Sequence, residues 1–246
     1  LVSSPSGYRL LCELLSRAWL TNTWRAKAEI KRDWLDGAQG LIVLSGARHS
    51  DVGQALLAGN NGSAIKLVRM WRKMLPDAYF IELQRTENEA DHHYSRLAVD
   101  LAGNENIPVV ATHPVQFLKQ DEFSAHEARV CISEGEILSN PNRPKNFTPD
   151  QYLKTTLEMV EAFKDVPSAI HNAVKVAQRC NLSLILGQPQ LPDFPTPDGS
   201  SINQYLIQLS EAGLVQRMVQ CFPGEAEREA KQSQYSDRLA LECKTI

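Results

Sequence analysis

The chain has 246 residues, of which 43% are hydrophobic and 22% charged, which is typical of a soluble globular protein and allows one large α/β domain plus part of a second. Its net charge of −3 argues against a surface built throughout for nucleic acid, so any DNA contact should be local. Five scattered cysteines and no apolar run of about 20 residues indicate reduced thiols and no membrane contact, so we expect a cytoplasmic protein.

The first half of the sequence predicts helices alternating with strands. An amphipathic helix over residues 7–20 is followed by a polar connection. Buried strands are predicted within residues 40–46, 77–84 and 107–112, and helices over 50–60, 63–76 and 89–106. This order favours right-handed βαβ units and a mainly parallel sheet, in which reactive groups collect beyond the carboxyl ends of the strands.

The second half is mainly helical. A helix over residues 148–165 is predicted with Thr148 as its cap and Pro149 at its first position. Further helices are predicted over residues 121–135, 167–181, 202–218 and 224–243. A strand is predicted over residues 182–186, and the proline-rich stretch 187–201 marks a domain boundary or an extended arm.

The chain starts at Leu1, without a methionine or a signal-peptide pattern, and stops within a charged helical segment. We therefore expect an internal piece of a longer protein.

Common catalytic motifs are missing from the sequence. It contains no GxGxxG, P-loop, GxSxG or HExxH pattern. The small residues of "SGARHSDVG", residues 45–53, favour a tight turn between strand and helix over a phosphate-binding loop.

The six histidines give few candidate ligands. His92 and His93 are adjacent on a helix and point about 100° apart, so they cannot share a metal. His126 and His171 have no second ligand at a diagnostic spacing. His49 and His113 remain as candidates, because each follows a buried strand and both can face the same rim of the sheet.

Several motifs occur in one order: "GLIVLSGARHSDVGQALLAGN", "YFIELQRT", "IPVVATHPVQFLKQDEFSAHEARVCISEG", "NFTPDQYLKTTLEM" and "LPDFPTPDG". Together they resemble the bacterial replicative DNA polymerase III alpha subunit. The resemblance implies that residues 1–186 are most of a polymerase and histidinol phosphatase (PHP) domain, an irregular βα barrel whose first strands are missing. It also implies that residues 187–246 are a linker and the mainly helical beginning of the palm region.

The parent protein would be a DNA-directed DNA polymerase acting on DNA and deoxynucleotides. Its activity requires palm carboxylates, typically an Asp-x-Asp pair, that hold two Mg²⁺ ions. No Asp-x-Asp occurs in this chain. The fragment is therefore expected to be inactive alone and to contain no catalytic residue and no cofactor.

The resemblance also implies a dismantled PHP metal site. Members with an intact site begin with His-x-His, which is absent here, and carry a histidine where this chain has Thr86. They also carry an Asn-Asp-x-His run where this chain has His113, Pro114, Val115 and Gln116. Proline offers no side-chain ligand, and glutamine is a poor one beside imidazole or carboxylate.

Three functions remain as hypotheses. The first is a scaffold without metal that docks the proofreading exonuclease subunit and contacts other replicase subunits. The alternative is a metal-dependent phosphoesterase or nuclease that uses His49, His113 and upstream histidines. The third is an unrelated α/β domain, which the ordered series of motifs disfavours. Without the first barrel strands, the piece is expected to have an open sheet edge and low stability.

Overall fold

The computed structural model describes residues 1–189, 191–197 and 199–246. The chain divides into two compact units, Leu1–Leu184 and Ile185–Ile246.

A parallel sheet forms the centre of the first unit. It contains β3 (Val43–Leu44), β4 (Tyr79–Gln84) and β5 (Val109–Thr112) in the order β3-β4-β5. Leu44 lies opposite Phe80, and Gln84 lies opposite Thr112. The three predicted strands of the first half and their parallel direction are therefore confirmed, and all three strands end at the same edge of the sheet.

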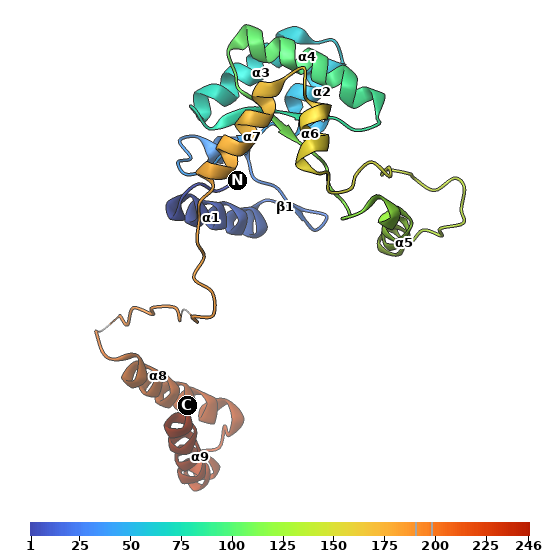
Figure 1. The fold of residues 1–246 in the computed structure, drawn as a ribbon. Coiled ribbons are helices and arrows are strands. Elements are labelled where there is room, and N and C mark those ends of the chain that lie inside the picture. The colour runs from blue at the N-terminus through green and yellow to red at the C-terminus, as the bar shows by residue number, and fades with distance from the viewer. Residues whose placement is uncertain (190, 198) are drawn as a thin grey trace. The chain divides into compact units, whose positions relative to one another are not determined.

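Helices cover one face of the sheet (Figure 1). These are α2 (Asp51–Leu57), α3 (Asn61–Met74) and α4 (Glu89–Glu105). Side chains alternate across a strand, so Tyr79, Ile81 and Leu83 of β4 point to this face and join the main core. Ser50 caps α2 and Asn60 caps α3, each accepting a hydrogen bond from a backbone N–H in the first turn.

The opposite face holds a smaller core. Phe80 packs there with Ile42, Val110 and Val176. Val176 belongs to α7 (Pro167–Arg179), which packs against β5 and follows the short helix α6 (Thr156–Ala162). The central strand β4 thus contributes apolar side chains to the cores on both faces, as expected for a strand covered on both sides.

The N-terminal helix α1 (Pro5–Thr21) is held close to the chain that enters β3. A side chain at Gly7 would place its Cβ 2.1 Å from the carbonyl oxygen of Gly40, so only glycine permits this approach. Leu14 and Ala18 are buried on the same helix. Beyond α1, the predicted polar connection contains an antiparallel hairpin, β1 (Thr23–Trp24) and β2 (Lys27–Ala28), which the sequence did not predict.

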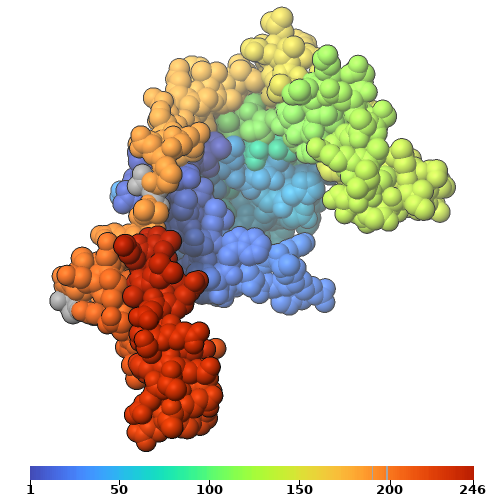
Figure 2. Space-filling model, turned by 90° about the horizontal axis from the view of Figure 1, so that it is seen from below, coloured from blue at the N-terminus to red at the C-terminus, as the bar shows by residue number. Residues whose placement is uncertain are grey.

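An arm leaves the sheet after β5. It contains α5 (Phe123–Glu134) and a long irregular segment, and Figure 2 shows it as a yellow-green lobe beside the body of the unit. The arm returns beside its own start, because the N–H of Gln116 donates to the carbonyl oxygen of Gln151 at 2.8 Å. Phe117 and Tyr152 form a parallel bridge at the same place.

Two predicted elements are wrong. The helix predicted over residues 148–165 begins only at Thr156, because residues 151–153 pair with the arm, and Thr155 rather than Thr148 caps it. The strand predicted over residues 182–186 has no regular structure. Leu184, Ile185 and Leu186 are exposed, since no strand edge pairs with them.

The predicted βα barrel is not confirmed. The sheet that contains β3, β4 and β5 is three-stranded in the described part of the chain and does not close on itself. A mixed fold of helices and small sheets is what the structure supports. No helix formed by the described residues is long and apolar enough to cross a membrane.

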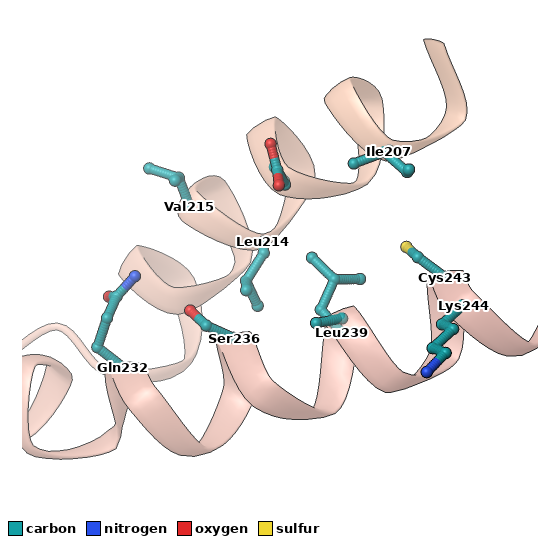
Figure 3. Close-up of a pocket in the computed structure, with 10 residues that line it drawn as sticks. Ile207, Leu214, Val215, Gln232, Ser236, Leu239, Cys243 and Lys244 are labelled. Atoms are coloured by element: carbon teal, nitrogen blue, oxygen red, sulfur yellow. The ribbon is translucent and has the colours of Figure 1, made fainter. Parts of the chain in front are cut away.

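The second unit is a pair of helices, α8 (Ile202–Cys221) and α9 (Glu225–Thr245), which confirms the two helices predicted there. Ser201 caps α8 in a capping box with Gln204. Leu214 and Leu239 point toward one another across the groove between these helices (Figure 3). No residue of α9 is buried, so this unit contributes little apolar core of its own.

Candidate functional site at the carboxyl edge of the sheet

A buried carboxylate joins the ends of the three strands. Glu82 of β4 is 9% exposed, and its Oε1 accepts a hydrogen bond from the Thr112 hydroxyl of β5 at 2.5 Å. Its Oε2 accepts from the backbone N–H of Gly46, just after β3, at 3.0 Å. Gln84 donates its amide to the same Oε1 at 3.2 Å. Both oxygens are occupied by protein donors, which is how a buried carboxylate is stabilised without an opposing cation.

The backbone around Glu82 is fixed as well. Its N–H donates to the Ser45 hydroxyl at 3.0 Å, and its carbonyl oxygen accepts from the Tyr94 hydroxyl at 3.0 Å. Ser45 follows β3, and Tyr94 belongs to α4. This position therefore links the sheet edge to the covering helices.

Thr86 lies just before helix α4, two residues ahead of its cap, Asn88. It is 8% exposed, and its hydroxyl donates to Asp91 Oδ2 at 2.5 Å. The N–H of Asn88 donates to the Thr86 oxygen at 3.1 Å. The other oxygen of Asp91 pairs with Arg48 Nε at 2.8 Å. At this position, where the resemblance implies a histidine in intact sites, the threonine hydroxyl is used in hydrogen bonds within the protein.

His113 connects the sheet edge to the arm. Its Nε2 lies 2.9 Å from the carbonyl oxygen of Asp150. A carbonyl oxygen only accepts, so Nε2 carries the proton in this contact and is not available to a metal. Pro114 contributes a carbonyl oxygen that accepts from the Gln151 amide at 3.4 Å, and the side chain of Gln116 is exposed. These positions hold the returning arm.

His49 lies apart from this network. It ends a single 3-10 turn after β3 and is exposed. Among the described residues, no group of three or more His, Cys, Asp or Glu side chains is arranged to hold a metal ion. The residues at the three positions that the resemblance marks as altered ligand positions do not fit a metal: Thr86 is bonded to Asp91, Pro114 has no side-chain ligand, and Gln116 is exposed.

Arg85, just after β4, links the segment between α6 and α7 to the same edge of the sheet. Its guanidinium pairs with Asp165 through contacts of 2.5 and 2.8 Å and donates to the carbonyl oxygen of Ala162 at 2.6 Å. The hydrogen bonds from Arg85 hold the pKa of Asp165 below its usual range. Arg85 also lies over the ring of Phe163, 4.8 Å from its centroid.

The remaining histidines are placed largely as the sequence predicts. His92, His93 and His171 are exposed. His126 of α5 is instead buried inside the arm, where its ring contacts Phe117 and Phe147 with centroids 5.3 and 4.8 Å apart. Burial lowers its pKa, which favours the neutral imidazole in this aromatic setting.

Sequence reasoning did not single out Glu82, the residue with the most partners at this edge. The available signal was a carboxylate inside the apolar run of β4, between Ile81 and Leu83. A charged residue in the interior of a buried strand requires partners, so it marks a polar network or a site.

Comparisons with known proteins give the family context. Residues 1–86 match the family model described as PHP domain. The chain is 43% identical over 248 residues to the DNA polymerase III subunit alpha of Pseudomonas aeruginosa. It is 41% identical over 247 residues to that of Escherichia coli K12, and 38% identical over 247 residues to that of Vibrio cholerae. Each match covers 100% of this chain and 21% of the relative, so the chain spans about a fifth of their length.

Proposed function

We propose that this chain, which is homologous over its whole length to about a fifth of the bacterial DNA polymerase III alpha subunits, serves as a metal-free PHP scaffold within such a subunit. In this role it docks the proofreading exonuclease subunit and holds it near the polymerase, alongside other replicase subunits. The observation that carries the proposal is the sheet edge. The polar groups that a PHP metal site would need there are replaced or are bonded to the protein itself.

Five contacts support this use of the edge. Glu82 is saturated by Thr112, Gly46 and Gln84. The Thr86 hydroxyl donates to Asp91, and Asp91 also pairs with Arg48. A metal ion would have to break these hydrogen bonds and replace them with fewer ligands, which buried polar groups resist.

The polymerase chemistry of the proposed parent subunit belongs elsewhere. A DNA-directed polymerase uses carboxylates with two Mg²⁺ ions to hold the attacking and leaving oxygens of a deoxynucleotide on DNA. This sequence has no Asp-x-Asp pair to supply them. The proposed contribution of residues 1–246 is therefore positional.

The test is binding of the exonuclease subunit by the full-length alpha subunit. We expect binding with and without EDTA, unchanged by His113→Ala and by the exposed control His171→Ala, because no metal takes part. Absence of binding would contradict the proposed docking role. Loss of binding in EDTA would contradict the proposal that docking needs no metal.

A phosphoesterase assay on the same proteins addresses the alternative. If the chain acts as a scaffold, we expect no Mn²⁺-dependent or Zn²⁺-dependent hydrolysis of a phosphodiester. Hydrolysis that His113→Ala abolishes and His171→Ala leaves intact would favour a working metal site.

A further inference from the structure

The hairpin β1–β2 presents a tryptophan at its tip. Trp24 and Lys27 lie directly opposite each other, and Arg25 and Ala26 form the two-residue turn between them. The hairpin is closed at its base by Asn22, whose side-chain amide donates to the carbonyl oxygen of Glu29 at 2.8 Å. Figure 1 shows this hairpin extending beyond the end of α1.

The turn is held in an unfavourable backbone conformation. Arg25 and Ala26 have φ angles of 47° and 60°, in the left-handed region that two-residue hairpin turns require. Glycine, asparagine or aspartate normally occupies such positions, because a side chain with Cβ is disfavoured there. An arginine in this place carries its charge to the tip of the hairpin at a conformational cost, and such strain is concentrated at functional sites.

The Trp24 side chain is exposed, and the neighbouring Arg25 stacks on its ring. The residue is 68% exposed, and the Arg25 guanidinium lies over its ring, 4.2 Å from the centroid. One face of the indole is therefore covered by a cation and the other remains open. Trp19, at the end of α1, is also 60% exposed, and α1 contacts both strands of the hairpin.

Exposed cations lie in the hairpin and just after it in the sequence, although the whole protein has a net charge of −3. Arg25, Lys27 and Lys31 are exposed and form no ion pair in the part of the chain that the structure describes. Glu29 is the one acidic residue between Trp24 and Lys31 in the sequence. Unpaired cations beside an open indole face suit a ligand that carries both aromatic rings and negative charge.

We propose that this hairpin binds single-stranded DNA. A base stacks on the open face of Trp24, and the adjoining phosphates are contacted by Arg25, Lys27 and Lys31. Stacking on an exposed aromatic side chain and neutralisation of phosphates by nearby cations are the two interactions by which single strands are bound without sequence preference. The proposal goes beyond the scaffold role and does not depend on exonuclease docking.

A protein partner is the competing use of exposed tryptophan and arginine, which are frequent anchors of protein interfaces. The hairpin favours DNA, because Arg25, Lys27 and the nearby Lys31 form no ion pair among the described residues and would each need an acidic partner in a protein interface, whereas successive phosphates supply that charge. The two uses make different predictions for the same variants.

Photocrosslinking localises the contact in the full-length subunit. An oligothymidylate carrying 5-bromodeoxyuridine is irradiated with the protein, and crosslinked peptides are identified by mass spectrometry. We expect a crosslink at Trp24 that Trp24→Ala removes and that the exposed apolar control Leu20→Ala leaves in place. Trp24→Phe, which keeps a stacking ring, should retain part of the yield.

Binding affinity gives the second readout. For the oligothymidylate, Trp24→Ala should weaken binding by about five- to a hundredfold if the hairpin is the principal contact. Replacing Arg25 and Lys27 by glutamine should flatten the dependence of log K on log salt by about 0.7 for each phosphate that the variant no longer neutralises. Circular dichroism confirms that these exposed substitutions leave the fold intact.

Two results would overturn the proposal. One is crosslinking confined to other parts of the subunit, with the oligothymidylate affinity of Trp24→Ala equal to that of Leu20→Ala. The other is loss of exonuclease binding in Trp24→Ala, with no change in DNA affinity or in crosslinks to other parts of the subunit. That result would assign the hairpin to a protein interface.

Discussion

Glu82 illustrates at the scale of one residue how a carboxylate at a sheet edge is used for structure. It accepts hydrogen bonds from three donors that come from or directly follow β3, β4 and β5. Thr86 and His113 act similarly, one at the start of α4 and one at the root of the arm. The side chains that remain at this edge therefore hold neighbouring segments together.

Replacing Glu82 tests that role. Glu82→Ala leaves the Gly46 N–H and the Thr112 hydroxyl without their acceptor, and we expect the free energy of unfolding to fall by about 2–3 kcal/mol. Urea denaturation measures this change. Glu87→Ala, at an exposed position nearby, should alter stability by no more than about 0.5 kcal/mol. Equal effects of the two substitutions would contradict the network.

The local stability of the start of α6 should depend on pH through Glu158. Hydrogen bonds from the Tyr152 hydroxyl and from Thr155 lower its pKa from 4.5 to about 2. Because the folded pKa is depressed, the stabilisation is present above pH 4.5 and is lost as the pH falls toward about 2. Amide protection factors at the start of α6, which are corrected for the intrinsic exchange rate at each pH, should fall across that range.

The Glu158→Gln variant provides the control for this titration. It should remove the pH-dependent fall in protection at the start of α6, whereas Glu134→Gln, in α5, should leave that fall unchanged. An unaltered pH profile in Glu158→Gln would show that another group is responsible.

At the scale of an element, the position of α1 depends on one glycine. The Cβ of Gly7→Ala would meet the Gly40 carbonyl oxygen, carbon and Cα within 2.9 Å, so α1 must shift away from the chain that enters β3. We expect a loss of about 2–4 kcal/mol in thermal or urea denaturation. Gly103→Ala in α4 meets nothing within 4 Å and should be neutral or stabilising by up to about 1 kcal/mol. A neutral Gly7→Ala would contradict the close approach.

Elements with strong local signals were predictable from the sequence. The apolar runs of β4 and β5 and the amphipathic pattern of α1 identified two strands and a helix within a few residues. The start of α6 was not predictable, because residues 151–153 are taken up by hydrogen bonds to Gln116 and Phe117, far earlier in the chain. The hairpin was missed because Arg25 and Ala26 carry no turn signal.

The site was partly predictable for the same physical reasons. The family resemblance drew attention to Thr86, Pro114 and Gln116, and residue chemistry then marked proline and glutamine as unsuitable or poor ligands. Their structural partners, Asp91 and Gln151, could not be identified from the sequence, since those contacts follow from how α4 and the arm fold back. The run at residues 182–186 was misread as a strand, because its apolar character does not reveal whether a sheet edge is available to pair with it.

At the scale of the whole molecule, the two units differ in how much core they contain. The first unit has apolar clusters on both faces of its sheet. The second is a helix pair in which α8 buries Met218 while Leu209, Val215 and Val219 remain exposed. Two helices alone bury too little apolar surface for independent stability. We therefore expect the second unit to show weaker amide protection than the sheet of the first, as hydrogen exchange would measure.

The central claim is that the sheet edge carries structure in place of a metal site, and metal content tests it most directly. The full-length subunit is incubated with Mn²⁺ and Zn²⁺, desalted and measured by inductively coupled plasma mass spectrometry, beside His113→Ala and the control His171→Ala. The account predicts the same far substoichiometric metal content in all three proteins. Stoichiometric metal that His113→Ala removes and His171→Ala retains would contradict it.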